Sequence, residues 1–263
     1  IELALKLDKT VLSLTADDYK ENSLADLLVL KESVYDINLQ VFYMMRDSIT
    51  GWPGGKPNAV IPAHPERSSP HPKRVMIFSP HPDDDIISMG GTFMRLHDQG
   101  HDVHVAYQTT GNIAVADDEA LRFAEFVVDF NEKFESSNAK ANKIYKEAVK
   151  FLKGKRDSEI DIESVREIKG LIRQGEAKNT CRFVGIKKEN AHFLNMPFYE
   201  TGTIRKKPLT EPDIQLIMDI IEEVQPHQIY AAGDLADPHG THKVCLDAIF
   251  EAITRLKHRE YMK

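Results

Sequence analysis

Short apolar runs alternate with amphipathic stretches through most of the chain after residue 72. The apolar runs are typical of buried strands in a parallel sheet, and they lie at 74–79, 102–109, 190–197 and 227–233. Stretches with apolar residues at helical spacing separate them, at 88–100, after Thr210 and after Thr241. This repeated strand and helix order predicts a Rossmann-like α/β fold with three layers, α/β/α, and a mostly parallel sheet.

Two further regions flank or interrupt this pattern. Residues 1–50 have the spacing of helices, and the prolines, glycines and serines of 49–74 indicate an extended linker. We therefore place a boundary near Pro72, with a helical N-terminal extension and linker at 1–72 and the main domain at 73–263. Residues 117–178 are charged and strongly helical, which predicts an inserted group of two or three helices, at about 117–170.

The composition narrows the class of protein. A net charge of −7 without a long basic tract argues against nucleic acid or an anionic membrane surface as a partner. Cys181 and Cys245 lack CxxC spacing, which favours a reducing, cytoplasmic location and disfavours a thiolate metal site. No apolar stretch is long enough to span a bilayer. Because the chain begins at Ile1 and ends in a predicted helix, we expect a fragment of a longer protein, and its oligomeric state stays open.

Carboxylates and imidazoles gather after two of the predicted strands. The first strand leads into FSPHPDDDIISMGGT, which contains His81, Asp83, Asp84 and Asp85. The fourth leads into GDLADPHGTH, which contains Asp234, Asp237, His239 and His242. Parallel strands end at the same edge of a sheet, where ligands bind. Clustered carboxylates repel one another there, and a cation would offset that cost. Imidazoles with carboxylates suit Zn²⁺ with open positions for water.

A simpler interpretation exists for each cluster alone. Asp84 or Asp85 could cap a helix that starts near Ser88, and His239 and His242 could be surface residues of a turn. Both clusters are expected at one edge of the sheet, after separate strands. That coincidence favours a metal site.

The motifs of this edge resemble those of a known family. SPHPDDDIISMGGT is similar to the (A/S)-H-P-D-D-E motif of the LmbE/PIG-L zinc-dependent de-N-acetylases. DPHGTH resembles that family's second motif, and RQGEA at 173–177 resembles its R-x-x-E-A helix start. The resemblance covers about residues 73–257. It implies a hydrolase that removes an acetyl group from an N-acetylated amino sugar.

The resemblance also implies roles for single residues. His81, Asp84 and His242 would be the metal ligands, for Zn²⁺ or another divalent ion. Asp83 would be the general base, and His239 would stabilise the oxyanion or act as an acid. Arg173 would contact the substrate. Asp85 departs from the family, which usually has glutamate at this position.

The chain also resembles the C-terminal half of bacterial two-domain proteins named glucosamine-6-phosphate deaminase. This resemblance implies fusion to an N-terminal deaminase domain and N-acetylglucosamine 6-phosphate as a candidate substrate. Phosphate needs cations, and the loop after the third strand offers Arg205, Lys206 and Lys207. A solvated basic loop explains the same residues. Asn112 follows the second strand and is a further candidate substrate contact, although loop asparagines often satisfy turns.

Two other functions remain open from the sequence. The chain could be a catalytically inactive α/β binding or regulatory domain of a larger amino-sugar enzyme, in which the motif persists without chemistry. It could also hydrolyse phosphate esters, although that chemistry often uses two metal ions, and the ligand set here is sufficient for one.

Overall fold

The computed structural model describes residues 1–29, 33–48, 72–136, 139–156, 159–201, 206–232 and 240–262. The chain divides into two compact units, Ile1–Pro72 and Lys73–Lys263. Each unit has its own hydrophobic core. No helix among the described residues is both long enough and apolar enough to cross a membrane.

The first unit is helical, as its sequence pattern predicts. Its helices are α1 (Glu2–Lys6), α2 (Ala16–Glu21), α3 (Ala25–Val29) and α4 (Val34–Ser48), with a short 3₁₀ turn at Val11–Ser13. Thr15 begins α2 with a capping box, in which its side chain and that of Asp18 each bond the other's backbone amide. Tyr19 is buried and donates a 2.7 Å hydrogen bond to Asn38, which ties α2 to α4.

The second unit is built on a four-stranded sheet whose strands are all parallel. The strands are β1 (Arg74–Ser79), β2 (Asp102–Tyr107), β3 (Ala191–Phe193) and β4 (Gln228–Ala231), in the order β3-β2-β1-β4. The two central strands pair in register from Arg74 with Asp102 to Ser79 with Tyr107. This arrangement brings the ends of β1 and β4 side by side, although they lie far apart in the sequence.

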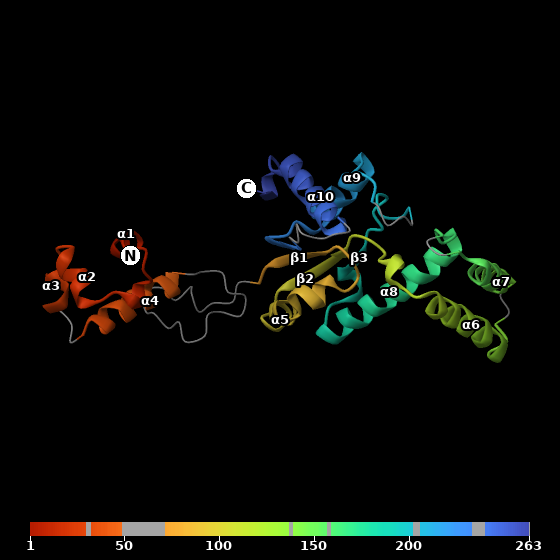
Figure 1. The fold of residues 1–263 in the computed structure, drawn as a ribbon, viewed down its shortest axis with the longest axis horizontal. Coiled ribbons are helices and arrows are strands. Elements are labelled where there is room, and N and C mark those ends of the chain that lie inside the picture. Colours follow the sequence, from red (N-terminus) through yellow and green to blue (C-terminus); the bar gives the residue numbers. More distant parts are fainter. Residues whose placement is uncertain are drawn as a thin grey trace. The chain divides into compact units, whose positions relative to one another are not determined.

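Helices cover both faces of the sheet, because successive side chains of a strand point to opposite faces. Val75 and Ile77 of β1 pack with α5 (Asp84–Asp98) and α8 (Glu163–Val184). Met76 and Phe78 pack with α9 (Glu211–Val224) and α10 (Thr241–Leu256). Figure 1 shows the two pairs of helices on opposite sides of the strands. The predicted three-layer α/β/α fold is therefore confirmed.

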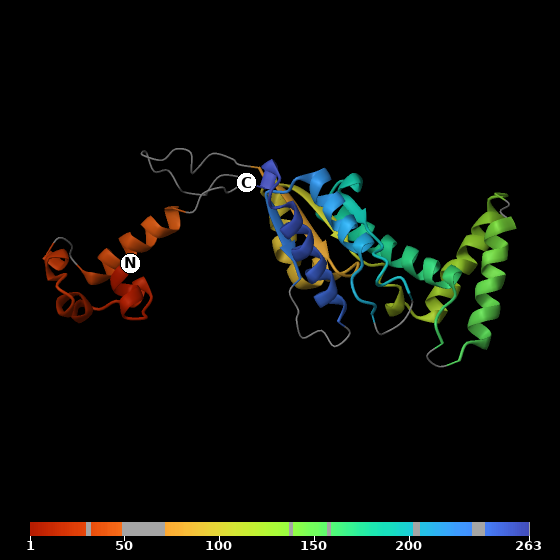
Figure 2. The ribbon, with the colours of Figure 1, turned by 90° about the horizontal axis from the view of Figure 1, so that it is seen from above.

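The charged helical segment forms a hairpin of α6 (Asp117–Lys133) and α7 (Ala139–Gly154), which extends away from the sheet beyond α8 in Figure 1 and Figure 2. A partly buried ion network joins the hairpin to α8. The Lys169 ammonium lies 2.6 Å from Asp117 Oδ1 and 2.7 Å from Asp161 Oδ2, and the Lys169 side chain is only 4% exposed. Lys155 also pairs with both carboxylates. Two cations thus balance two anions where the insertion meets the main domain.

The element boundaries agree with the sequence prediction except at the start of α5. Its first turn begins at Asp84, where the helix dipole favours negative charge, and Met89 (φ −145°, ψ 24°) interrupts the helix beside the predicted start near Ser88. The third strand, Ala191–Phe193, lies inside the predicted segment 190–197, and backbone hydrogen bonds from Leu194 to Tyr107 and from Met196 to Gln108 continue its contact with β2. Gly100, with φ 82°, follows the end of α5, as predicted. The predicted N-cap of α9 at Thr210 is also confirmed.

Candidate metal centre

The loop after β1 is held by the side chain at the end of the strand. The Ser79 hydroxyl donates a 2.6 Å hydrogen bond to the carbonyl of His81 and accepts one of 3.0 Å from the amide of Asp85. Both bonds fold residues 80–83 back over the strand end before α5 starts. Within this segment, the side chains of His81 and Asp84 lie side by side at the carboxyl edge of the sheet, with His81 Nδ1 3.2 Å from Asp84 Oδ2.

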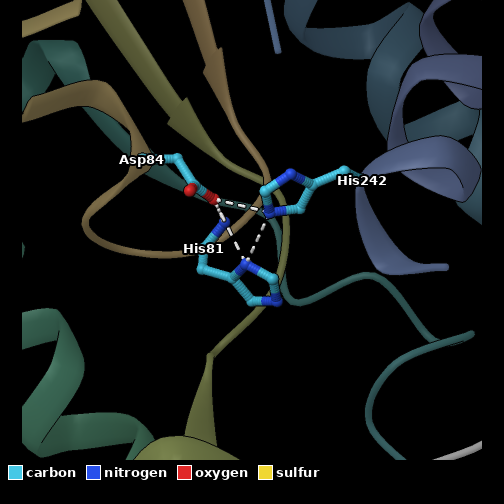
Figure 3. Close-up of side chains that lie close together, drawn as sticks. All are labelled: His81, Asp84 and His242. Carbon is cyan, nitrogen blue, oxygen red and sulfur yellow. Dashed lines mark hydrogen bonds and ion pairs between the residues drawn. The ribbon is translucent and has the colours of Figure 1, made fainter. Parts of the chain in front are cut away.

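His81, Asp84 and His242 meet at this edge, and Figure 3 shows their side chains pointing toward one another. His81 Nδ1 lies 3.2 Å from Asp84 Oδ2 and 3.2 Å from His242 Nε2. His242 Nε2 lies 3.3 Å from Asp84 Oδ2, so the three atoms form a nearly equilateral triangle. His242 comes from the first turn of α10, which follows β4. The predicted convergence of two distant segments is therefore present in the structure.

The triangle has the dimensions that a small divalent cation requires. Two ligand atoms about 2.0–2.2 Å from a tetrahedral ion lie roughly 3.3–3.6 Å apart, close to the distances between these donors. The side chains are 24%, 12% and 18% exposed for His81, Asp84 and His242, so the site is sheltered but open on one side. The residues present therefore fit a metal ion with free coordination positions.

The electrostatics of Asp84 agree with a role as an anionic ligand. Burial acts to raise the pKa of Asp84, but hydrogen bonds from the His81 side chain and amide, with the charges of both imidazoles, outweigh it. The net effect is a lowered pKa. The carboxylate is therefore ionised at neutral pH, as metal binding needs.

A cavity of about 430 Å³ opens beside the triangle. Its lining includes His81 and Asp84, the neighbouring carboxylate of Asp83, and the cationic side chains of Arg173 and Lys206. The Asp83 side chain is 37% exposed. This volume is within the range of roughly 300–1,000 Å³ that small-molecule sites occupy. The cavity thus combines a triangle of candidate metal ligands, a separate carboxylate and positive charge.

The other predicted site residues fall into three groups. Arg173 Nη2 lies 2.7 Å from Asp83 Oδ2, and the Lys206 ammonium lies 3.7 Å from the centre of the Tyr199 ring, so both cations are at the cavity. The structure does not bring Asn112 or Lys207 to the cavity lining. Asn112 is buried and donates to Thr110 and Glu200, whereas Lys207 is exposed. His239 and Arg205 lie outside the described residues, as do Asp234 and Asp237.

Five residues of the cavity lining were not predicted as site residues: Gly111, Ile113, Ala114, Tyr199 and Thr241. Tyr199 is buried, and its ring meets the His81 imidazole edge-on at 5.8 Å between centroids. Gly111 has φ 64° and lies against Pro82 and Arg173. Tyr199 follows the third strand and Gly111 the second, so the rule that located the metal site, the carboxyl ends of parallel strands, also indicated these positions.

Asp85 lies behind the triangle rather than in it. It is 1% exposed and accepts a 2.8 Å hydrogen bond from the hydroxyl of Tyr107, which is fully buried. Burial raises the pKa of Asp85, and the hydroxyl opposes that shift. The thiol of Cys181 lies 3.2 Å from the same hydroxyl. Asp85 therefore anchors the first turn of α5 to β2, and the same Tyr107 hydroxyl contacts α8.

Comparison with known proteins decides the family. The sequence model of the family described as PIG-L: GlcNAc-PI de-N-acetylase matches residues 76–253. This chain belongs to the PIG-L family. The match includes both segments that contribute to the triangle of His81, Asp84 and His242. The candidate site therefore belongs to a chain of a de-N-acetylase family.

The proteins similar to this PIG-L chain include a curated relative and a solved structure. A putative glucosamine-6-phosphate deaminase-like protein of Bacteroides thetaiotaomicron is 52% identical over 246 residues, which are 93% of this chain. The chain spans only 37% of that relative's length. The solved structure of N,N'-diacetylchitobiose deacetylase from Pyrococcus horikoshii, in complex with its inhibitor MPG, matches with a TM-score of 0.45 and 19% identity. That match covers 72% of this chain and 52% of the deacetylase chain.

Proposed function

We propose that this chain is a metal-dependent de-N-acetylase that hydrolyses the acetamide of an N-acetylated amino sugar. The observation that supports the proposal most is the triangle of His81, Asp84 and His242 beside the Asp83 carboxylate in one cavity. Amide hydrolysis needs an electrophilic carbonyl and a group that moves a proton, and these residues offer a place for each. Membership of the PIG-L family supports the same reaction.

His81, Asp84 and His242 would hold the metal, and Zn²⁺ suits this donor set best. When bound, the ion supplies Lewis acidity, which polarises an amide carbonyl and makes a water molecule more acidic. The protein would supply three donor atoms and leave the remaining coordination positions of the ion open. The exposed side of the triangle, toward the cavity, leaves room for water and substrate.

Asp83 would carry the proton during the reaction. Its carboxylate would accept a proton from the attacking water, whose oxygen adds to the carbonyl carbon. The same carboxylate would then return the proton to the nitrogen as the C–N bond breaks, which gives acetate and a free amine. His239 stays a proposed second proton donor or oxyanion partner, from outside the described residues.

N-acetylglucosamine 6-phosphate is the substrate that we propose first. Lys206 places an ammonium group at the cavity, and an ammonium is a common partner of phosphate. The name of the Bacteroides relative contains glucosamine 6-phosphate, the amine that this deacetylation would release. We propose that the longer protein couples deacetylation to a deaminase in its remaining part.

Acetate release from a panel of N-acetylated hexosamines and their 6-phosphates tests the reaction. The zinc-loaded chain should release acetate from at least one member, and Asp83→Asn should reduce kcat by at least about 100-fold while metal content stays equal. Full activity of Asp83→Asn, or no acetate from any member with one equivalent of zinc bound, would overturn the proposal.

Substitutions of Lys206 and Lys207 test whether the substrate carries a phosphate group. Lys206→Ala should raise KM for the phosphorylated sugar much more than for its unphosphorylated analogue. Lys207→Ala is the matched control, because this exposed neighbour does not line the cavity. Equal effects of Lys206→Ala on both sugars would remove the phosphate from the proposal and leave the deacetylation intact.

A further inference from the structure

Arg173 makes two ion pairs in the wall of the cavity. Its Nη2 lies 2.7 Å from Asp83 Oδ2, and its Nη1 lies 3.0 Å from Glu176 Oε2. Glu176 is one turn further along α8, so it holds the guanidinium from the helix on which Arg173 itself stands. The Arg173 side chain is 15% exposed, whereas that of Glu176 is 57% exposed. The guanidinium is therefore fixed between an outer carboxylate and the carboxylate at the cavity.

The backbone around Arg173 is shaped to admit the guanidinium. Gly111 has φ 64°, and a Cβ on it would lie 2.9 Å from Pro82 Cδ and 3.3 Å from Arg173 Nε. Arg173 thus packs tightly against the loop after β2. The same glycine also touches Pro82, the residue directly before Asp83. The absence of a side chain on Gly111 therefore allows Arg173 and Pro82 to pack closely against the same backbone.

The Asp83 side chain is not held by its own helix. Asp83 is the residue before α5, with φ −147° and ψ −14°, and in the described part of the chain its carboxylate makes no capping hydrogen bond to that helix. A carboxylate at a loop end has rotamer freedom, which a charge-assisted hydrogen bond of 2.7 Å removes. Such fixing is what proton transfer requires, since a displacement of about 1 Å can cost roughly 100-fold in rate.

We propose that Arg173 is a positioning residue, which orients the Asp83 carboxylate for proton transfer, and not the substrate contact that the family resemblance implies. This inference rests on the proposed function, because it assigns Asp83 the proton. Each terminal nitrogen of Arg173 lies against a carboxylate. Lys206 is the other cationic side chain among the described residues that line this cavity.

The test separates kcat from KM in the zinc-loaded full chain. Arg173→Gln should lower kcat by about 10- to 100-fold and change KM by less than about threefold, with zinc content equal to wild type. Arg173→Lys should recover part of kcat, because it keeps the charge but cannot serve both carboxylates in one plane. Arg182→Gln is the matched control, an exposed arginine on the same helix away from this cavity, and should behave as wild type.

A rise in KM at unchanged kcat would overturn the inference and make Arg173 a substrate contact. Loss of zinc from Arg173→Gln would overturn it in favour of support for the metal site. Crystal structures of wild type and Arg173→Gln give a readout that needs no activity: the Asp83 carboxylate should lose its single position in the variant. An unmoved, ordered Asp83 would refute the positioning role, whereas absence of acetate release from wild type would refute only the proposed reaction.

Discussion

Replacing Tyr107 by phenylalanine removes one oxygen atom from a buried contact behind the loop that carries His81 and Asp84. The Tyr107 hydroxyl donates to Asp85 Oδ2 at 2.8 Å, and neither side chain is more than 1% exposed. The ring itself packs among Val103, Val105 and the apolar side of α8, and phenylalanine would keep that packing. The substitution therefore isolates the hydrogen bond.

The expected cost follows from the burial of the acceptor. Leaving a buried acceptor without its donor costs about 1–3 kcal/mol, and water cannot reach Asp85 to replace the lost donor. For a domain of this size each kcal/mol shifts the unfolding temperature by about 2–4 °C, so Tyr107→Phe should lower it by about 2–12 °C. Because Asp85 follows a proposed ligand directly, zinc binding should weaken as well.

Differential scanning calorimetry of the full chain measures the stability, and titration with zinc measures the affinity. Tyr145→Phe is the matched control, because that hydroxyl lies 3.4 Å from Glu125 at the surface of the hairpin. It should change the free energy of unfolding by less than about 0.5 kcal/mol. If Tyr107→Phe unfolds at the same temperature as Tyr145→Phe, the buried hydrogen bond does not hold the loop and the reasoning is refuted.

Metal, backbone conformation and acid provide three further tests. Zinc at about 100 times its dissociation constant should stabilise the chain by about 2.7 kcal/mol in thermal unfolding, and an equal gain in His81→Ala or His242→Ala would refute a shared site. Gly111→Ala should lower the free energy of unfolding in urea by at least about 1–2 kcal/mol, because φ of Gly111 is 64°. Gly175→Ala is the control, because the added Cβ has open space around it, and it should not lose stability. Equal urea midpoints for the two variants would contradict this. Burial acts to raise the pKa of Asp117, but hydrogen bonds from two lysine ammonium groups outweigh it and lower the pKa. The ionised Asp117 therefore stabilises the chain at pH values above its ordinary pKa, and this stability is lost as the pH falls through the lowered pKa. Asp117→Asn should accordingly make the urea midpoint fall less steeply toward acid pH. An unchanged fall would count against the ion network.

The order of strands and helices was predictable because each signal is local. A buried parallel strand needs a short apolar run, and an amphipathic helix needs apolar residues at helical spacing. The first turn of α5, which begins at Asp84, was not predicted, because three successive aspartates are typical of a charged loop unless a helix dipole stabilises them.

The part of the candidate site that lies at strand ends and in sequence motifs was predictable. His81 and Asp84 are three residues apart, and the turn into a helix places them together. His242 required the sheet order, which sets β4 beside β1. The Lys206 and Asn112 predictions used the same rule, yet only Lys206 lines the cavity, because side-chain direction in a loop depends on partners such as Thr110 and Glu200.

By itself the sequence determined the α/β class, the two segments that carry the candidate metal ligands and the family, because these rest on periodicity and on motifs read along the chain. Only the tertiary structure decided which partners those segments meet. The pairing of Arg173 with Asp83 joins α8 to the loop after β1, and the bond from Tyr107 to Asp85 joins β2 to α5. Contacts of this kind depend on distances across the packed layers, and no spacing along the chain specifies those distances.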